Sequence, residues 1–337
     1  MTKLFLPTSQ KEIKALAWDY IDVILFSGDA YVDHPAFGIA VIARVLQNEG
    51  YRVAVVPQPN WQDDLRDFKK LGKPRLFFGV SAGNMDSMVN HYTANKRLRS
   101  DDAYTADGRA GARPDYATIV YSNILKEIYP DTPVVIGGVE ASMRRFTHYD
   151  YWKNKVLPSI IVSSKADFLI YGMAEKSIAM LTESLSKNID YKHIPQLVYR
   201  SDMPENQIDN SIVLNSYQDC LKDKKKYAEN FKIIETESNK MYGKVLVQNN
   251  ENETIVANPM FATISSDDLD AVHALPFTRL PHPRYKKKAQ IPAYEMIKNS
   301  INIHRGCFGG CSFCTISAHQ GKFVSSRSEK SIMQELE

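Results

Sequence analysis

Short apolar runs alternate with amphipathic segments through the first 190 residues of the chain. The apolar runs are rich in β-branched residues and end at glycine, proline or polar positions, as buried strands do. The predicted strands cover residues 22–26, 52–56, 75–80, 133–137 and 166–171. Between them, apolar residues three or four positions apart predict helices over residues 38–47, 116–128 and 175–185. Because buried strands that alternate with helices form parallel sheets covered on both faces, the pattern predicts an α/β fold with a doubly wound parallel sheet.

Polar loops follow these strands at the carboxyl edge of the predicted sheet, where α/β folds bind their ligands. The first loop carries Asp29, Asp33 and His34, which either line a substrate pocket or make local turn hydrogen bonds. Residues 84–114 form a long polar stretch, and loops of this length are usually functional or mobile. Glu175 lies at the start of a predicted helix, where the helix dipole is a sufficient reason for a carboxylate.

A glycine pair and an arginine pair follow the fourth predicted strand. Gly137 and Gly138 either bring backbone N–H groups to a phosphate or allow the strand to pack closely on a helix. Glu140, Arg144 and Arg145 come next in the chain. The two arginines either hold an anionic substrate or form surface ion pairs, and ion pairs are the simpler interpretation.

The pattern weakens after residue 190. Residues 196–199, 244–248 and 254–257 predict strands of a small antiparallel unit, and residues 219–231 predict a charged surface helix. Later, the alternation around Ile301 and Ile303 predicts a strand that leads into a loop. Ser326 and Glu329 then fit a capping box at the start of a final helix. We therefore expect three regions, at residues 1–190, 191–292 and 293–337.

The composition is that of an ordinary globular protein, with 44% hydrophobic and 24% charged residues over 337 positions. It excludes a collagen, a coiled coil and a wholly disordered chain. No apolar run approaches the roughly 18–20 residues that span a bilayer, and no signal peptide is visible, so we expect a cytoplasmic protein without a membrane partner. The formal net charge of +3 does not by itself imply a nucleic-acid partner. The lysines of residues 222–226 lack organised base-stacking aromatics, so nucleic acid stays an unfavoured partner.

Three of the four cysteines fall within eight residues, as Cys307, Cys311 and Cys314. Three thiolates on one short loop can hold three irons of a [4Fe–4S] cluster and leave the fourth iron free for another ligand. Cys220 is isolated, and we expect a plain thiol there. In a chain without an export signal, such a cluster of cysteines indicates metal or redox chemistry and not disulfides.

Two glycines, Gly309 and Gly310, lie inside this C-x3-C-x2-C segment. Because glycine tolerates positive φ, we expect them to let the backbone wrap closely around a cluster. The competing interpretation is a structural zinc site with His304 or His319 as the fourth ligand, although zinc sites more often use C-x2-C pairs. Three free thiols are the remaining alternative.

The C-x3-C-x2-C spacing, with Phe313 directly before the last cysteine, resembles the signature of the radical S-adenosylmethionine superfamily. The resemblance implies that Cys307, Cys311 and Cys314 bind three irons, that S-adenosylmethionine binds the fourth, and that Phe313 packs near the adenine. It also implies one-electron cleavage of S-adenosylmethionine to a 5′-deoxyadenosyl radical, which acts on a substrate the sequence does not name. A donor such as flavodoxin or ferredoxin would supply the electron.

Three further segments, residues 27–38, 137–146 and 269–282, resemble the YgiQ-like family of radical S-adenosylmethionine proteins. This resemblance covers the whole chain and implies a Rossmann-like amino-terminal domain followed by a radical (β/α) barrel. A complete barrel needs about 200 residues or more, so the residues after Cys314 suffice only for its first βα unit. We therefore expect an amino-terminal fragment that is inactive as given.

The doubly wound domain also resembles the cobalamin-binding domains of some radical S-adenosylmethionine enzymes. Those domains often use an Asp-x-His-x-x-Gly motif whose histidine can bind cobalt. Here Asp33 is adjacent to His34 and Gly38 comes one residue late, so we expect the fold without that ligand. The rival hypothesis is a non-catalytic α/β protein that binds a small ligand and uses the cysteine loop as a structural zinc or iron–sulfur site.

Overall fold

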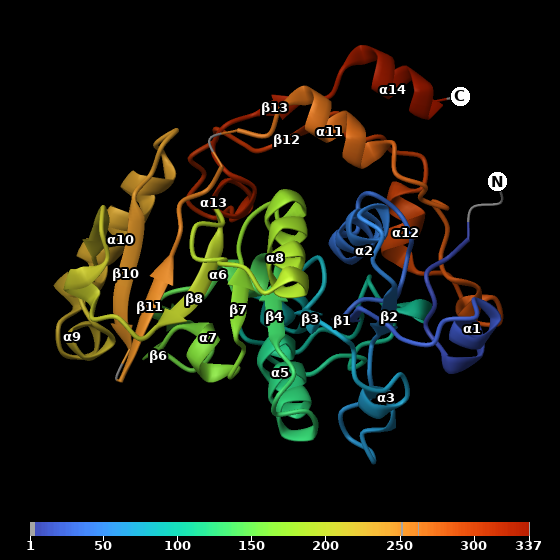
Figure 1. Ribbon diagram of the computed structural model, residues 1–337, viewed down its shortest axis with the longest axis horizontal. Coiled ribbons are helices and arrows are strands. Elements are labelled where there is room, and N and C mark those ends of the chain that lie inside the picture. The colour runs from blue at the N-terminus through green and yellow to red at the C-terminus, as the bar shows by residue number, and fades with distance from the viewer. Residues whose placement is uncertain (1–3, 251, 262, 337) are drawn as a thin grey trace.

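A nine-stranded sheet runs through the described part of the chain in the computed structural model (Figure 1). The structure describes residues 4–250, 252–261 and 263–336. The strand order is β2-β1-β3-β4-β7-β8-β11-β10-β9. The strands are β1 (Val23–Ser27), β2 (Val53–Pro57), β3 (Phe77–Ser81), β4 (Val134–Gly137), β7 (Phe168–Ile170), β8 (Leu197–Ser201), β9 (Ser211–Val213), β10 (Val245–Asn250) and β11 (Glu253–Ala257).

The first five strands in this order pair in parallel, which confirms the predicted doubly wound α/β fold. Val23 of β1 lies opposite Val53 of β2 on one side and opposite Phe77 of β3 on the other. From β1 the chain first passes to β2 and then returns to β3 on the other side, so the direction of winding reverses between β1 and β3. Doubly wound sheets bind ligands at the carboxyl ends of their strands, next to such a switch point.

Alternate side chains of each central strand enter two hydrophobic cores, one on each face of the sheet. On β1, Val23 and Leu25 belong to the first core, and Ile24 and Phe26 to the second. The first core is covered by α2 (Gly38–Asn48), α8 (Glu175–Lys187) and α12 (Pro292–Ile297). The second is covered by α1 (Gln10–Ala15), α3 (Arg66–Lys69), α5 (Ala117–Ile128) and α7 (Ile160–Ser163). Burial on both faces is the reason that the strands read as continuous apolar runs.

The strands after residue 190 extend this sheet and do not form a separate unit. β8, β11 and β10 pair antiparallel as predicted, but β8 also pairs antiparallel with β7 and so continues the parallel half. Tyr199 lies opposite Phe168, and Val198 lies opposite Leu169. These apolar pairs cover an edge of β7 that would otherwise present unpaired backbone groups. β9 then pairs in parallel with β10.

The helix predicted over residues 219–231 is two helices, α9 (Tyr217–Lys222) and α10 (Lys224–Ser238). Asp223 lies between them with an extended backbone, and its side chain accepts a hydrogen bond from the Lys225 N–H at 2.8 Å. Aspartate is a favoured N-cap, so it ends the first helix and begins the second. Shorter elements complete this half of the molecule: α4 (Ser87–His91), α6 (Gly138–Met143), β5 (His148–Asp150) and β6 (Lys155–Leu157).

The C-terminal segment passes along one edge of the sheet, at the top of Figure 1. It contains α11 (Ser266–His273), β12 (His304–Arg305), α13 (Ile316–Gln320), β13 (Ser325–Ser326) and α14 (Glu329–Leu336). The strand predicted around Ile303 is the two-residue β12, which pairs antiparallel with β13. The final helix is present, but Ser328 caps it, because the Ser328 Oγ accepts from the Ser331 N–H at 3.1 Å. The capping box predicted at Ser326 is therefore wrong.

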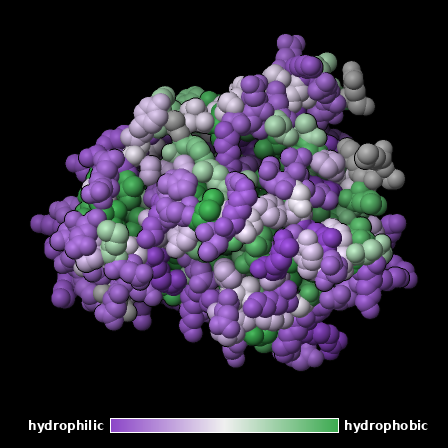
Figure 2. All heavy atoms as spheres, viewed as in Figure 1, coloured by the Kyte–Doolittle hydropathy of each residue, from purple (hydrophilic) through white to green (hydrophobic). Residues whose placement is uncertain are grey.

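The molecular surface is mostly hydrophilic on the face shown in Figure 2, with hydrophobic side chains in scattered patches. None of the described helices is long and apolar enough to cross a membrane. Several large hydrophobic side chains of the C-terminal segment are exposed: Ile303, Phe308, Phe313, Ile316, Val324, Met333 and Leu336.

Candidate functional site

The three neighbouring cysteines lie on a loop whose two ends are held together. β12 and β13 pair at its base, and beside them the Cys307 N–H donates to the Gly321 carbonyl at 3.0 Å. Gly306 has a φ of 88°, and a Cβ at this position would overlap the carbonyl oxygen of Phe323. Only glycine fits where two backbone segments approach this closely, so the position of the first residues of the cysteine loop is fixed relative to Phe323.

The thiols themselves lie at the surface of the loop. Cys307 and Cys314 are half-buried, and Cys311 is exposed. The Gly309 N–H donates to the Cys307 Sγ at 3.4 Å. A Cβ on Gly309 would stand 3.3 Å from the Cys307 Sγ and 3.8 Å from the Cys311 Sγ, so this glycine leaves space between two sulfurs. Among the described residues, no three cysteine, histidine or acidic side chains stand close enough together to hold a metal ion.

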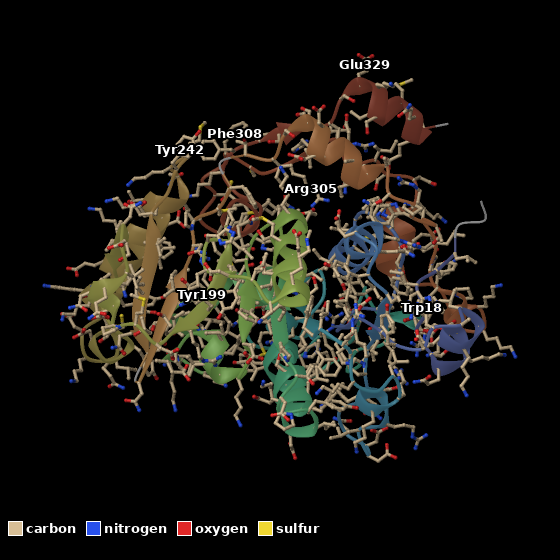
Figure 3. The ribbon with its side chains drawn as sticks, viewed as in Figure 1. Trp18, Tyr199, Tyr242, Arg305, Phe308 and Glu329 are labelled. Carbon is tan, nitrogen blue, oxygen red and sulfur yellow. The ribbon has the colours of Figure 1, made fainter. Side chains whose placement is uncertain are left out.

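The expected reason for the two loop glycines is wrong, because neither Gly309 nor Gly310 has a positive φ. Gly309 instead provides room between sulfurs. Apart from its two chain neighbours, no described residue comes within 4 Å of where a Cβ on Gly310 would stand. Phe308 and Phe313 are the most exposed aromatic side chains of the loop, at 87% and 89%. Figure 3 shows Phe308 on the outer side of the molecule, away from the sheet.

A cavity of about 410 Å³ lies between the carboxyl edge of the sheet and the cysteine loop. Ser27 of β1 and Ser81 of β3 line it at the switch point, and Arg305 and His319 line it from either side of the cysteines in sequence. Its apolar lining includes Leu25, Ile39, Ile42, Val80, Val135, Ile170 and Ile178. The topology predicted a ligand position at this edge, and the structure has a cavity there.

Asp29 lines the cavity and belongs to a buried ionic network. Arg113 Nη1 lies 2.8 Å from Asp29 Oδ1, and Arg113 Nη2 lies 3.0 Å from Asp102 Oδ2. The Asn84 N–H donates to Asp29 Oδ2 at 2.7 Å. Burial raises the pKa of Asp29 to about 6, and the Arg113 guanidinium opposes that rise. Sequence reasoning missed Arg113; the only signal was its place in the long polar stretch at residues 84–114.

Asp33 and His34, predicted as pocket residues, lie outside the lining of this cavity. Asp33 forms a buried ion pair with Arg44, whose Nε donates at 3.0 Å, and also accepts from the Thr278 N–H at 2.8 Å. The Nδ1 of His34 accepts from the Ala36 N–H at 3.1 Å. Burial lowers the pKa of His34 to about 4, so the imidazole is neutral at physiological pH. Both side chains fix the loop after β1 and do not point to a ligand.

Gly137 and Gly138 line the cavity, and close packing explains both glycines. Gly138 has a φ of 84°, and a Cβ there would stand 2.6 Å from the Ser81 Oγ. A Cβ on Gly137 would stand 3.3 Å from the Ile170 carbonyl oxygen. The packing interpretation therefore needs no phosphate.

Glu140 and Arg144 are also held by contacts within the protein. Glu140 accepts hydrogen bonds from the N–H groups of Ser87 at 2.8 Å and Thr118 at 2.9 Å, near the starts of α4 and α5. Arg144 forms an ion pair with Asp86. Arg144 therefore forms an ion pair as expected, but the pair is buried and does not lie on the surface.

Arg145 and Cys220 are the remaining candidates. Arg145 donates to the Ser142 carbonyl at 2.8 Å and lies over the ring of Tyr171, 4.6 Å from its centroid. Cys220 is buried on α9, where the Asn230 Nδ2 donates to its sulfur at 3.2 Å. Burial raises the pKa of Cys220 to about 11, which fits a plain thiol.

Glu175 and Arg305 connect the sheet domain to the cysteine loop. Glu175 begins α8, and Arg305 ends β12, two residues before Cys307. The Glu175 Oε1 lies 3.5 Å from the Arg305 Nη1. Figure 3 shows Arg305 near the N-terminal end of α8, between this helix and the cysteine loop. The helix dipole alone does not account for Glu175, and its long-range partner was not visible in the sequence.

A family model described as Radical SAM N-terminal matches residues 5–300. The chain belongs to this radical SAM N-terminal family. Its relatives include UPF0313 proteins from Bacteroides thetaiotaomicron, 57% identical over 98% of the chain, and Porphyromonas gingivalis, 58% identical over 98%. The chain spans about half the length of these curated relatives, 56% and 53% respectively. The family resemblance drawn from the sequence is thereby confirmed.

Solved structures with a similar fold include that of the radical S-adenosylmethionine methyltransferase TsrM from Kitasatospora setae, with cobalamin and a [4Fe–4S] cluster bound. The match has a TM-score of 0.50 and 17% identity, and it covers 94% of this chain and 45% of that one. A second TsrM structure, with tryptophan substrate and an S-adenosylmethionine analogue, matches with the same TM-score at 18% identity, over 93% of this chain and 44% of that one. At this identity the likeness shows the fold alone.

Proposed function

We propose that this member of the radical SAM N-terminal family binds a [4Fe–4S] cluster through Cys307, Cys311 and Cys314 and serves a radical S-adenosylmethionine enzyme. The observation that carries the proposal is the C-x3-C-x2-C segment. It lies on a loop whose start is held in place at Gly306, beside the cavity at the carboxyl edge of the sheet. The family match supports it independently. Three thiolates leave one iron without a protein ligand, which is the position S-adenosylmethionine takes in enzymes with this signature.

The cysteine loop has donors of the right chemical kind for such a group, although the three thiols do not converge on one point in the structure. The space at Gly309 lies between the sulfurs of Cys307 and Cys311, where a larger side chain would contact both. The Gly309 N–H already donates to the Cys307 sulfur, and N–H donors of this kind tune the potential of iron–sulfur clusters. When bound, the cluster supplies one electron for reductive cleavage of S-adenosylmethionine to methionine and a 5′-deoxyadenosyl radical. Phe313 would pack against the adenine.

The outer side of the loop suits electron transfer. Cys311 is exposed, and Phe308 presents apolar surface on the same loop. A small electron donor such as flavodoxin or ferredoxin would approach from this side, while a cytoplasmic setting would keep the thiols reduced. The loop does not indicate the substrate of the complete enzyme; the adjacent cavity is considered below as a binding site for a small molecule.

Anaerobic iron–sulfur reconstitution of the 337-residue chain tests the proposal. We expect about four irons and four acid-labile sulfides per chain, as in other [4Fe–4S] proteins. Each of Cys307→Ala, Cys311→Ala and Cys314→Ala should lose most of this iron. Cys220→Ala is the matched control, because that thiol is buried far along the chain on α9, and it should keep the full complement.

Spectroscopy then separates the proposed enzyme from its rival. A dithionite-reduced sample should give an EPR signal that changes when S-adenosylmethionine is added. Stoichiometric zinc without sulfide, held by the same three cysteines, would instead support a structural site in a non-catalytic protein. Iron content that is equal in the loop variants and the unaltered chain would overturn the cysteine assignment.

A further inference from the structure

The ion pair between Glu175 and Arg305 is incompletely satisfied. Its N–O distance of 3.5 Å is long for a charged hydrogen bond. The second carboxylate oxygen, Glu175 Oε2, is buried and has no hydrogen-bond partner in the described part of the chain, and the same holds for Arg305 Nε. Buried polar groups almost always have partners, so one free acceptor and one free donor at the same place need an explanation.

Both side chains line the 410 Å³ cavity, which gives them room to turn toward a bound molecule. Much of the rest of the lining is apolar, with Ile39 and Ile42 from α2 and Ile178 from α8, and polar residues such as Asn84 and Gln320 lie among them. A mostly apolar cavity with a few convergent polar groups is the usual form of a small-molecule site. A cavity of about 410 Å³ suits a compact molecule and not a strand of nucleic acid.

The charges around the cavity select against anions. Glu175 and Arg305 cancel each other, and apart from the imidazoles of His304 and His319 the only other carboxyl, amino or guanidinium side chain among the described lining residues is that of Asp29. Asp29 shares the single guanidinium of Arg113 with Asp102, so this network is net negative when both carboxylates are ionised. A phosphate or carboxylate would therefore meet uncompensated negative charge, whereas a neutral group carrying both a donor and an acceptor would satisfy both free atoms.

We propose that the cavity binds a compact, neutral, mostly apolar molecule whose amide-like edge pairs with Glu175 and Arg305. An N–H of the ligand donates to the Glu175 Oε2, and its carbonyl accepts from the Arg305 Nε. The inference rests on the proposed function only in naming the adjacent loop as the cluster-binding loop. Because Arg305 lies two residues before Cys307, a bound molecule would also hold the start of that loop against α8.

Three isosteric probes test the chemistry: benzamide, which is neutral, benzoate, which is an anion, and benzamidinium, which is a cation. Isoleucine methyl NMR of the cluster-free 337-residue chain reports binding through Ile39, Ile42 and Ile178, with Ile13 in the other core as the reference. We expect saturable shifts at these three cavity isoleucines, and also at Ile136 and Ile170, which line the same cavity, but not at Ile13. Benzamide should bind about tenfold more tightly than either charged probe.

Glu175→Gln should change the order in which the three probes bind, which a purely structural role of Glu175 would not do. Removing this carboxylate leaves Arg305 uncompensated, so benzoate should gain about tenfold in affinity. Benzamide loses its charged acceptor and should bind more weakly, so benzoate should become the tighter of the two. Glu183→Gln, an exposed change on the same helix, should leave the order unchanged. Ile42→Phe, which fills part of the cavity, should abolish binding of all three probes even if Glu175→Gln fails to fold.

Two results would overturn the proposal. One is the absence of saturable shifts at the cavity methyls up to 20 mM of every probe. The other is a charged probe that binds the unaltered chain more tightly than benzamide. Since these measurements use the chain without iron, their failure would leave the cluster assignment intact, and failure of reconstitution would leave the cavity result intact.

Discussion

At the scale of single residues, a methyl group at Gly28 would collide with the neighbouring strand. The Cβ of an alanine there would overlap the backbone carbonyl oxygen of Ala82 and stand 3.3 Å from the Arg113 guanidinium. Backbone cannot move aside as a flexible side chain can, so we expect Gly28→Ala to lower the free energy of unfolding by about 1–3 kcal/mol. Urea denaturation followed by circular dichroism measures this loss.

Gly38→Ala is the matched control for that substitution, because it lies on the same side of the sheet at the start of α2. Apart from its chain neighbours and the backbone of its own helix, nothing in the described structure lies within 4 Å of the new methyl group. Alanine also has the higher helix propensity, so the control should be neutral or stabilising by up to about 1 kcal/mol. Equal destabilisation by the two alanines would show that the close contact with Ala82 is not the reason that glycine is needed at position 28.

Single residues also show what sequence reasoning about the site can reach. The cysteine loop was proposed as a site, and Asp29 was placed at the ligand-binding edge of the sheet, because their signals are local: a spacing of cysteines, and a polar side chain just after a strand. Asp33 carries the same local signal, but its partners are Arg44 and a backbone N–H 245 positions away at Thr278. Partners at such separation decide between a structural and a binding carboxylate, and no local pattern reveals them.

At the scale of elements, the parallel strands and the helices between them were predictable because burial on both faces gives continuous apolar runs. The division of the predicted helix at Asp223 and the N-cap at Ser328 were not predictable, because charged and polar surface residues are compatible with several helix boundaries. The joining of β8 to β7 was also missed. Strand pairing depends on which sheet edge is free in the folded molecule, and an apolar run in the sequence carries no information about that edge.

The final helix offers a direct test of one such choice. Ser328 accepts from the Ser331 N–H at 3.1 Å and donates to Asp270 Oδ2 at 2.5 Å, so it joins α14 to α11. We expect Ser328→Ala to cost about 1–2 kcal/mol of local stability, as the loss of an N-cap does. Ser326→Ala, at the cap that the sequence suggested, should cost much less. Hydrogen exchange of the α14 amides distinguishes the two, and a larger effect at Ser326 would restore the capping box.

At the scale of the whole molecule, the cavity is a product of two distant parts of the chain. The switch point between β1 and β3 supplies one side, and the residues around the cysteines supply the other. Neither part alone encloses the space. This arrangement gives a physical reason for the sheet domain and the cysteine loop to occur in one chain, because a molecule held at the sheet edge lies beside the loop.

The whole molecule should also be sensitive to acid. Burial lowers the pKa of His34, His273 and His282 to about 4 each, from 6.5 in an unfolded chain. Between these values the unfolded state binds more protons, so stability rises with pH and is lost as pH falls through this window. At pH 5 each histidine should cost about 2 kcal/mol relative to pH 7.5. Asp29 acts in the opposite direction, because its raised pKa of about 6 favours the folded state at low pH.

Burial also lowers the pKa of His148 and His319 to about 4, so five histidines act in this direction. They outweigh one aspartate, whose protonation returns only about 1 kcal/mol at pH 5. We therefore expect the urea midpoint to fall by a large fraction between pH 7.5 and pH 5, because total stabilities are only about 5–15 kcal/mol. His34→Gln should flatten this dependence, because it removes one proton-binding group from the unfolded state. His193→Gln, an exposed change, should not flatten it. A midpoint that stays constant or rises toward pH 5 would mean that these histidines are already charged in the folded protein, and that the loop after β1 is more open to water than its contacts indicate.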